Sequence, residues 1–203
     1  MMTDKHLPVR ERGRPREFDI DAALDLAMPV FREKGYHGAT ISDLTEAMQL
    51  TAGSVYKAFH DKRGLFLQVF VRYISLRNKT LRERLARQPD GRASLAEWLR
   101  FYLESASNLE GRRGCLIVGS AVELQQLDAE LSELVHEALG RNQQSILQLI
   151  EQGQQDGSVN SSHDAKALSS MLLCLVLGMR VAGKAGDLPA GEKLIATVLT
   201  LLE

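Results

Sequence analysis

The sequence is poor in cysteine, proline and aromatic residues, and each shortage excludes a class of protein. Cys115 and Cys174 are its only cysteines, too few for a disulfide-rich secreted scaffold. With 16 glycines and 5 prolines in 203 residues, the chain is neither collagen-like nor a disordered low-complexity protein. Aromatic residues make up 5% of a chain that is rich in leucine and alanine, and this balance favours an all-helical protein.

Long hydrophobic runs are also lacking. The longest extends from Met171 to Met179, is interrupted by Gly178 and ends at Arg180. A membrane span needs about 20 apolar residues, so we interpret this run as part of a buried helix. Residues 1–17 contain no apolar stretch typical of a signal peptide. We therefore expect a soluble, cytoplasmic protein.

The sequence has no large excess of either charge, because 25 Lys and Arg residues are balanced by 26 Asp and Glu residues, with a net charge of −1. This excludes a globally polycationic protein but allows a local basic patch. Residues 1–16 form such a patch, in which only Asp4 and Glu11 are acidic. A basic N-terminal segment indicates either a nucleic-acid-binding arm or a solvated tail. Its basic residues are Lys5, Arg10, Arg12, Arg14 and Arg16.

Apolar residues recur with helical spacing through most of the chain, and no alternating strand pattern is present. The fold class predicted is all-α. Helix starts are indicated by four capping residues, Asp19, Thr40, Thr51 and Asp61. The first helix is expected to end at Gly35. Further helices are expected from 61 to the break at 89–91, around 95–103, over 115–124 after a loop at 110–114, and over 129–152, 164–184 and 190–202.

The short second and third helices, joined by a tight turn at Gln49-Leu50, form a helix-turn-helix candidate. The small residues at the start of the third helix would let its backbone approach base edges in the major groove. Hydroxyl, imidazole and ammonium groups nearby suit phosphate contacts. An ordinary small helical bundle remains the alternative. The candidate DNA-binding residues are Arg12, Arg14, Arg16, Thr40, Thr51, Ala52, Gly53, Ser54, Tyr56, Lys57, His60 and Lys62.

Residues 12–73 resemble the tetracycline-repressor-like (TetR) family. The family pattern has a Thr before the second helix, followed by a run of the form Ser/Thr-x-Gly-x-hydrophobic-Tyr-x-x-Phe-x-x-Lys. Two positions depart from it: Gln49 occupies a turn position that is usually Gly, and Pro29 lies within the first helix, where we expect a kink. The matching positions are Thr40, Thr51, Gly53, Val55, Tyr56, Phe59 and Lys62.

The resemblance implies a one-component transcription regulator, usually a repressor, that binds a palindromic double-stranded operator as a homodimer. It implies an N-terminal three-helix helix-turn-helix domain and a C-terminal helical bundle for dimerisation and effector binding. A small molecule bound in that bundle would shift the two DNA-binding domains and release the operator. No cofactor is implied. The expected division is a basic arm at 1–16, a DNA-binding domain at 17–63, and an effector-binding and dimerisation domain at 64–203.

Two sets of residues in the second half are candidates for these roles, although each set could equally belong to an ordinary core. An apolar effector pocket is expected among the helices of residues 65–150. Its candidate residues are Phe70, Trp98, Phe101, Tyr102 and Cys115. A dimer interface is expected on the last two helices, through Leu168, Met171, Leu172, Leu175, Val176, Ile195, Val198, Leu199 and Leu202.

Cys115 follows Arg112-Arg113-Gly114 at the start of an expected helix, a setting that favours the thiolate. One hypothesis is that Cys115 senses oxidants or electrophiles; the alternative is a small buried residue, as we expect for Cys174. No enzyme is predicted, because the five histidines have no metal-ligand spacing and no phosphate-binding loop is present. The remaining alternatives are a helical protein–protein interaction module and a small helical enzyme.

Overall fold

The computed structural model describes residues 18–186, 188 and 191–203. These ranges contain α-helices and two short 3-10 helices and no strand, which confirms the all-α prediction. The basic residues of the N-terminal segment lie outside the described residues. The elements are α1 (Ile20–Gly38), α2 (Ile41–Met48), α3 (Ala52–Phe59), α4 (Lys62–Leu85), α5 (Gly91–Ser105), α6 (Asn108–Arg113), α7 (Leu116–Val122), η1 (Leu124–Gln126), α8 (Ala129–Asp156), α9 (Ala165–Ala185), α10 (Gly191–Leu199) and η2 (Thr200–Leu202).

The four predicted capping residues are confirmed. Asp19, Thr51 and Asp61 each accept hydrogen bonds from backbone N–H groups in the first turn of the helix that follows. Thr40 and Asp43 form a reciprocal capping box, in which each side chain accepts from the other residue's backbone N–H. These local bonds fix where α1, α2, α3 and α4 begin.

The first helix departs from the sequence prediction near its end. The backbone torsions at Pro29 stay helical, and the break lies instead at Gly35, with φ 75° and ψ 175°. The regular helix breaks at Gly35, as expected, and one further turn extends to Gly38. The expected kink at Pro29 is therefore replaced by a kink at Gly35.

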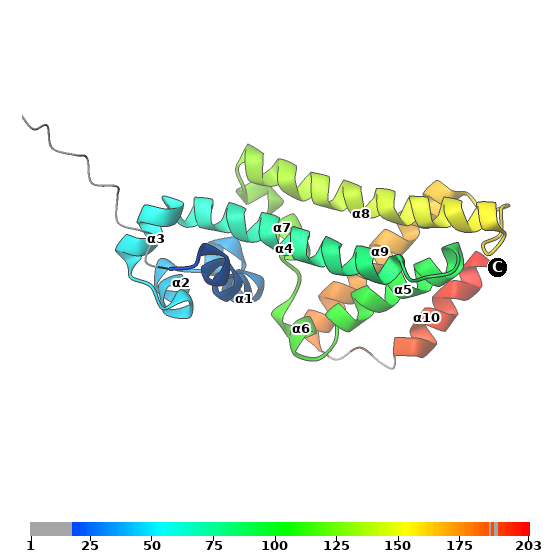
Figure 1. Cartoon of the computed structure of the whole chain (residues 1–203), viewed down its shortest axis with the longest axis horizontal. Helices are drawn as coiled ribbons and strands as arrows, with labels where there is room; N and C mark the ends of the chain where they lie inside the picture. Colours follow the sequence, from blue (N-terminus) through cyan, green and yellow to red (C-terminus); the bar gives the residue numbers. More distant parts are fainter. Residues whose placement is uncertain (1–17, 187, 189–190) are drawn as a thin grey trace, which may run out of the picture.

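Figure 1 shows α1, α2 and α3 at one end of an elongated molecule, from which α4 runs into the helices of the other end. One hydrophobic core lies among α1–α4 and continues into α7 and the first half of α8. A second core lies among α5, α8, α9 and α10. Helix α4 contributes to both, with Tyr73 in the first and Leu81 in the second. It therefore links the two ends of the molecule.

Two elements of the middle segment differ from the expectation. The segment at 110–114, expected as a loop, is mostly helical, because α6 extends to Arg113. Gly111 sits where an added Cβ would lie 2.2 Å from the carbonyl oxygen of Ala106 and 2.9 Å from that of Gly183. A glycine inside this short helix therefore permits close packing on α9. The next helix, expected to reach Leu124, ends at Val122, and η1 follows it.

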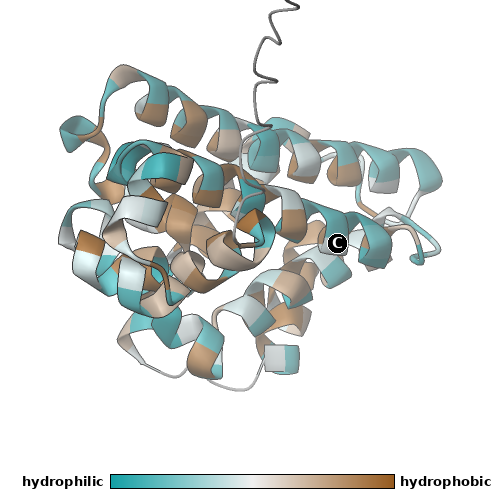
Figure 2. Cartoon of the chain, turned by 60° about the vertical axis from the view of Figure 1, so that its left-hand side comes forward, coloured by the Kyte–Doolittle hydropathy of each residue, from teal (hydrophilic) through white to brown (hydrophobic). Residues whose placement is uncertain are grey.

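Helix α9 carries apolar residues around most of its circumference. Figure 2 shows hydrophobic segments concentrated between the helices, with hydrophilic segments outside. Among the described residues, α9 alone is long and apolar enough to cross a membrane, with a mean hydropathy of 1.6 over 18 residues, of which 28% are buried. A helix that packs against a core or another subunit has the same composition, so length and hydropathy do not identify a membrane span.

The turn between α2 and α3 carries a strained residue, because Gln49 adopts a left-handed conformation with φ 54° and ψ 38°. This conformation costs an L-residue about 1–2 kcal/mol, whereas glycine adopts it freely. Glycine loses about 0.5–1 kcal/mol more backbone entropy on folding. We expect Gln49→Gly to raise the free energy of unfolding by about 0.5–1 kcal/mol in urea titrations at fixed protein concentration.

The matched control is Glu46→Gly, an exposed position inside the same helix, which should lower the free energy of unfolding by about 1 kcal/mol. If Gln49→Gly left the stability unchanged or reduced it as the control does, the left-handed turn would be contradicted.

Candidate nucleic-acid interface

Helix α3 presents a polar face to solvent and an apolar face to the core. Val55 and Phe59 are fully buried, while Tyr56 keeps 47% of its surface exposed. Thr51, Ala52 and Gly53, at the start of the helix, are exposed, and so are Lys57 and His60. The apolar stripe fixes the helix on the core and leaves the predicted base-contacting end free.

The N-terminal end of α3 is compact and preorganised. Thr51 Oγ1 accepts from the backbone N–H of Ser54 at 3.2 Å and lies 3.0 Å from Ser54 Oγ. An added Cβ at Gly53 would meet only Thr51 Oγ1, at 3.9 Å, so nothing within the protein requires glycine there. The space beside Gly53 is open to an approaching molecule.

The predicted phosphate-contacting groups differ in how free they are. The Thr40 hydroxyl caps α2 from an exposed position. The Lys62 ammonium donates to the carbonyl oxygen of Ala39 at 3.1 Å and lies 4.8 Å from the centre of the Tyr36 ring. Lys62 therefore ties the start of α4 to the segment before α2. Arg12, Arg14 and Arg16 lie outside the described residues, so their role stays a prediction.

The predicted effector residues do not gather around one cavity. Phe70 is buried in the first core, and Trp98, Phe101 and Tyr102 are buried in the second. The guanidinium of Arg77 lies 4.6 Å from the ring centre of Phe101 and 5.3 Å from that of Tyr102. Cys115 is the one predicted effector residue that lines the clefts around α7. The other four pack in the interior, and their proposed role stays untested.

A polar junction beside Cys115 joins the N-terminal helices to the rest of the molecule. The carbonyl oxygen of Gly114 accepts from Arg32 Nε at 3.0 Å and Arg32 Nη2 at 2.9 Å. It also accepts from Arg180 Nη2 at 2.9 Å. Arg32 is further paired with Glu110 at 2.8 Å. Residues from α1, α6 and α9 therefore converge at one backbone carbonyl.

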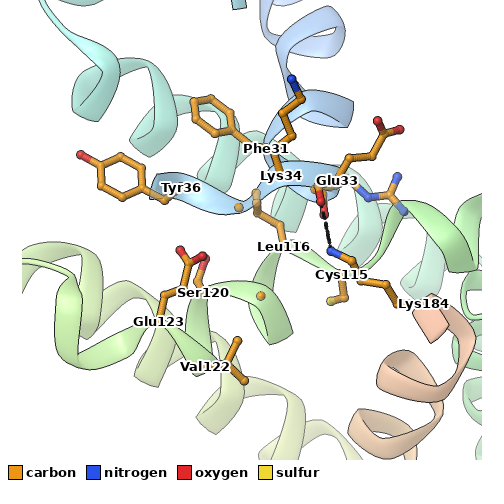
Figure 3. Close-up of a pocket in the computed structure, with 13 residues that line it drawn as sticks. Phe31, Glu33, Lys34, Tyr36, Cys115, Leu116, Ser120, Val122, Glu123 and Lys184 are labelled. Atoms are coloured by element: carbon orange, nitrogen blue, oxygen red, sulfur yellow. Dashed lines mark hydrogen bonds between the residues drawn. The ribbon is translucent and has the colours of Figure 1, made fainter. Parts of the chain in front are cut away.

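Lys184 adds a second connection across this junction. Its ammonium donates to the carbonyl oxygens of Arg32, at 3.1 Å, and Glu33, at 3.3 Å. Figure 3 shows Lys184 extending past Cys115 toward the end of α1, at the wall of a cleft of about 140 Å³. Sequence inspection missed Arg32, Arg180 and Lys184, because no local motif marks them and their contacts span most of the chain.

Cys115 is buried, and the cations that act on its thiol are not those expected. Burial raises the pKa of the Cys115 thiol. The charges of Arg180 and Arg77, together with a hydrogen bond from Tyr73, have the larger and opposite effect, so the pKa lies below its usual value. Tyr73 Oη lies 3.5 Å from Cys115 Sγ. The expectation that Arg112 and Arg113 supply this effect is corrected, since Arg113 pairs with Glu110 at 2.8 Å. Cys174, expected to be structural, is exposed.

The predicted dimer residues divide between a core and a surface. Their place in a dimer interface stays a prediction, and α9 and α10 turn several of them toward the core of the protomer. Met171 is exposed, and Leu168, Leu175 and Leu199 are half-buried. The residues buried within the protomer are Leu172, Val176, Ile195, Val198 and Leu202.

The outer face of α9 is instead formed by small and apolar residues at helical spacing. They include Ala167, Met171, Cys174, Gly178 and Val181, all exposed. An added Cβ at Gly178 would meet no atom within 4 Å. We call this set the α9 stripe.

Within the described ranges, no three His, Cys, Asp or Glu side chains gather closely enough to hold a metal ion.

Comparison with known families gives two matches along the chain. Residues 23–69 match the sequence model described as bacterial regulatory proteins, tetR family. Residues 91–197 match that described as tetracyclin repressor-like, C-terminal domain. The chain is 28% identical over 188 residues to the HTH-type transcriptional repressor ComR of Escherichia coli (strain K12), covering 92% of this chain and 90% of ComR.

Solved structures give the same picture. A cysteine mutant of the TetR family transcriptional regulator CifR, complexed with 26-bp double-strand operator DNA, is 34% identical to this chain. That match covers 94% of this chain and 98% of CifR, with a TM-score of 0.73. A TetR family transcriptional regulator from Agrobacterium tumefaciens matches with a TM-score of 0.81, over 90% of this chain and 96% of the other chain. Its sequence identity is 16%, so this match shows a similar fold alone.

The lowered pKa of the Cys115 thiol generates a prediction about its reactivity. In a Cys174→Ser protein, the rate of alkylation of Cys115 by iodoacetamide should rise with pH to its half-maximum at a lower pH than that of the small free thiol N-acetylcysteine amide. The midpoints of the pH profiles are compared, because burial also slows the maximal rate at Cys115. A Cys115 midpoint at or above that of the free thiol would contradict the electrostatic effect of Arg180 and Arg77.

Proposed function

Because the chain belongs to the tetR family of bacterial regulatory proteins, we propose that it is a homodimeric transcriptional repressor that binds operator DNA and is released from it by an effector. The observation that carries this proposal is the exposed start of α3, held in place by Val55 and Phe59. A rigid helix end with small side chains suits entry into the major groove. A DNA-bound repressor would act in the cytoplasm.

The roles proposed for the DNA-binding residues follow from their place on α3 and beside it, where most of them are exposed. Thr51, Ala52, Gly53 and Ser54 would face base edges, with the backbone at Gly53 closest to the DNA. A second set of groups, together with the basic arm, is proposed to contact phosphates. Phosphate contacts position a protein on the duplex, whereas contacts with base edges recognise the sequence. The second set consists of Thr40, Tyr56, Lys57, His60 and Lys62. No residue from 51 to 60 is acidic, so no carboxylate opposes the phosphates on α3 itself.

We further propose that two protomers pair through the α9 stripe. Small residues such as Gly178 allow helices to approach closely, and exposed Met171 and Val181 supply apolar surface that water would otherwise cover. The half-buried Leu168 and Leu175 flank this face. In a symmetric dimer the same patch of both subunits meets across the two-fold axis. Pairing would then set the separation of the two copies of α3.

The proposed division of labour assigns residues 17–63 to DNA binding and 64–203 to pairing and effector binding. The junction at Gly114 would carry the coupling between the two parts. Arg180 donates to the Gly114 carbonyl beside α1, and Lys184 donates to the Arg32 carbonyl within α1. An effector that displaced either cation would change the contacts that position α1. Allostery requires two sites joined by an element with two arrangements, and in this proposal the junction is that element.

The substitution Gly53→Ala is expected to weaken DNA binding without destabilising the protein. Because the added methyl group meets no protein atom closer than 3.9 Å, the helix should become about 0.5–1 kcal/mol more stable. Binding to a duplex selected by the unaltered protein from a random library should weaken by about tenfold or more, roughly 1.4 kcal/mol, because the methyl group obstructs the bases. Fluorescence anisotropy measures this affinity, and binding to an unrelated duplex should change little.

The matched control is Gly140→Ala on α8, an exposed glycine whose added Cβ also meets no atom within 4 Å. It should stabilise the protein without changing its affinity for DNA. Equal affinities for Gly53→Ala and the unaltered protein would refute close approach at α3. If the unaltered protein selects no duplex at all, a helical interaction module without a DNA role replaces the regulator.

Pairing through the α9 stripe predicts that Met171→Glu converts the dimer to a monomer. A carboxylate placed in an apolar interface must be desolvated without a partner, so the dissociation constant should rise at least about a hundredfold, roughly 2.7 kcal/mol. Analytical ultracentrifugation measures this change. Leu109→Glu is the control, because Leu109 is an apolar residue on α6 that is also exposed. A dimer that survives Met171→Glu as well as the control would place the interface elsewhere.

A further inference from the structure

Two buried or half-buried arginines near Cys115 have hydrogen-bond donors that nothing in the protein accepts. Arg180 is 2% exposed; its Nη2 donates to Gly114, whereas its Nε and Nη1 have no partner. Arg77 Nη1 donates to Ser105 Oγ at 3.0 Å, and its Nη2 has no partner. Within the described part of the chain, no Asp or Glu forms an ion pair with either guanidinium. A buried cation without a counter-ion is costly, so this arrangement favours an anion.

Arg180 also lines a cavity between α7 and α9. Its volume is about 320 Å³, which lies at the lower end of the range for small-molecule sites. One wall is apolar, formed by Val118 and Val122 from α7 and Val181 from α9. Arg180, Lys184 and Cys115 supply its polar groups, and none of the described residues that line it is acidic. The cavity therefore combines positive charge with an apolar surface.

Cys115 lies beside these guanidinium groups. The hydroxyl of Tyr73 donates to Cys115 Sγ, and the charges of Arg180 and Arg77 lower the pKa of its thiol. One thiolate could balance only one of the two guanidinium groups, so the cluster has an excess of positive charge in either protonation state of the thiol. A ligand of single negative charge would complete the balance and provide acceptors for the unpartnered N–H groups.

We propose that the cavity between α7 and α9 binds a small monocarboxylate with an apolar body, held through its carboxylate by Arg180 with Lys184 nearby. The proposal rests on the function proposed above, since this ligand would be the effector. Its apolar body would lie against the valine wall. Both cations also bind the junction, Arg180 through the Gly114 carbonyl and Lys184 through the carbonyls of Arg32 and Glu33. A carboxylate that draws on these donors would therefore compete with the contacts that position α1.

The test compares carboxylates with neutral molecules of the same shape. Hexanoate and benzoate are titrated by calorimetry into the full-length protein, with hexanamide and benzamide as the matched amides. At least one carboxylate should bind about tenfold or more tightly than its amide. If neither carboxylate binds at millimolar concentration, or if amides bind equally well, the proposal is overturned.

Two variants locate the binding. Arg180→Gln should abolish the preference for the carboxylate, but it also removes a bond to Gly114 and could prevent folding. Val122→Glu avoids this difficulty, because Val122 is 79% exposed at the edge of the cavity. It should bind the carboxylate about tenfold more weakly than Val122→Gln, which is isosteric with it, because both variants lose the apolar surface of Val122 and only the glutamate adds repulsion. Carboxylate binding that is equal in Val122→Glu and Val122→Gln would place the ligand elsewhere and overturn the proposal.

A thiol readout and a DNA readout complete the test. In a Cys174→Ser protein, the bound carboxylate should slow alkylation of Cys115 by iodoacetamide, and the amide should not. Unchanged alkylation in the presence of saturating carboxylate would refute the shared site. Release of a selected duplex by the carboxylate tests its role as effector separately. Carboxylate binding without DNA release would keep the site and refute the effector role, while the absence of any DNA binding would refute the proposed function alone.

Discussion

The carbonyl oxygen of Gly114 is where α1 and α9, which lie far apart in the sequence, are joined. It accepts hydrogen bonds from Arg32 and Arg180, and a bond from a charged donor contributes about 1.5–3 kcal/mol. The residue must be glycine for two reasons. Its φ is 85°, and an added Cβ would lie 2.9 Å from Lys184 Cδ and 3.2 Å from the Arg32 carbonyl oxygen. The position of the N-terminal helices relative to the bundle depends on this packed, polar contact.

The two arginines at this carbonyl differ in how completely they are satisfied. Arg32 uses Nε, Nη1 and Nη2, bonding to Gly114 and to both the side chain and the backbone of Glu110. Arg180 makes one bond and leaves Nε and Nη1 without partners. Arg32 therefore behaves as a fixed structural group, whereas Arg180 retains unused hydrogen-bonding capacity. This asymmetry indicates which side of the junction is able to respond to a ligand.

Local features of the fold could be predicted from the sequence, and long-range ones could not. The caps at Asp19, Thr40, Thr51 and Asp61 were predictable because each bond joins residues two or three positions apart. The break in α1 at Gly35 could be predicted from the glycine, but a glycine does not say whether a further helical turn follows. Helix α6 was missed because the fit of Gly111 against Ala106 and α9 exists only in the folded chain.

The same distinction separates the two candidate sites. The exposed end of α3 could be predicted because its polar and apolar positions follow from helical periodicity. On α9, apolar residues occupy more than one face, so periodicity did not distinguish the buried Leu172 and Val176 from the exposed Met171 and Val181. The charges around Cys115 were assigned to its neighbours in sequence, yet they come from Arg77 on α4 and Arg180 on α9. Only the packing of those helices brings them together.

The direction of any coupling follows from what happens to the bond between Arg180 and Gly114. An anion that binds Arg180 and leaves this bond intact stabilises the present position of α1. An anion that takes the guanidinium from Gly114 leaves a backbone carbonyl with fewer donors and favours another position. By linkage, a ligand shifts the equilibrium only by its difference in affinity for the two positions, and DNA must alter the affinity for that ligand by the same factor. Because α4 enters both cores, it is the element through which a displacement at α1 would reach both halves of the molecule.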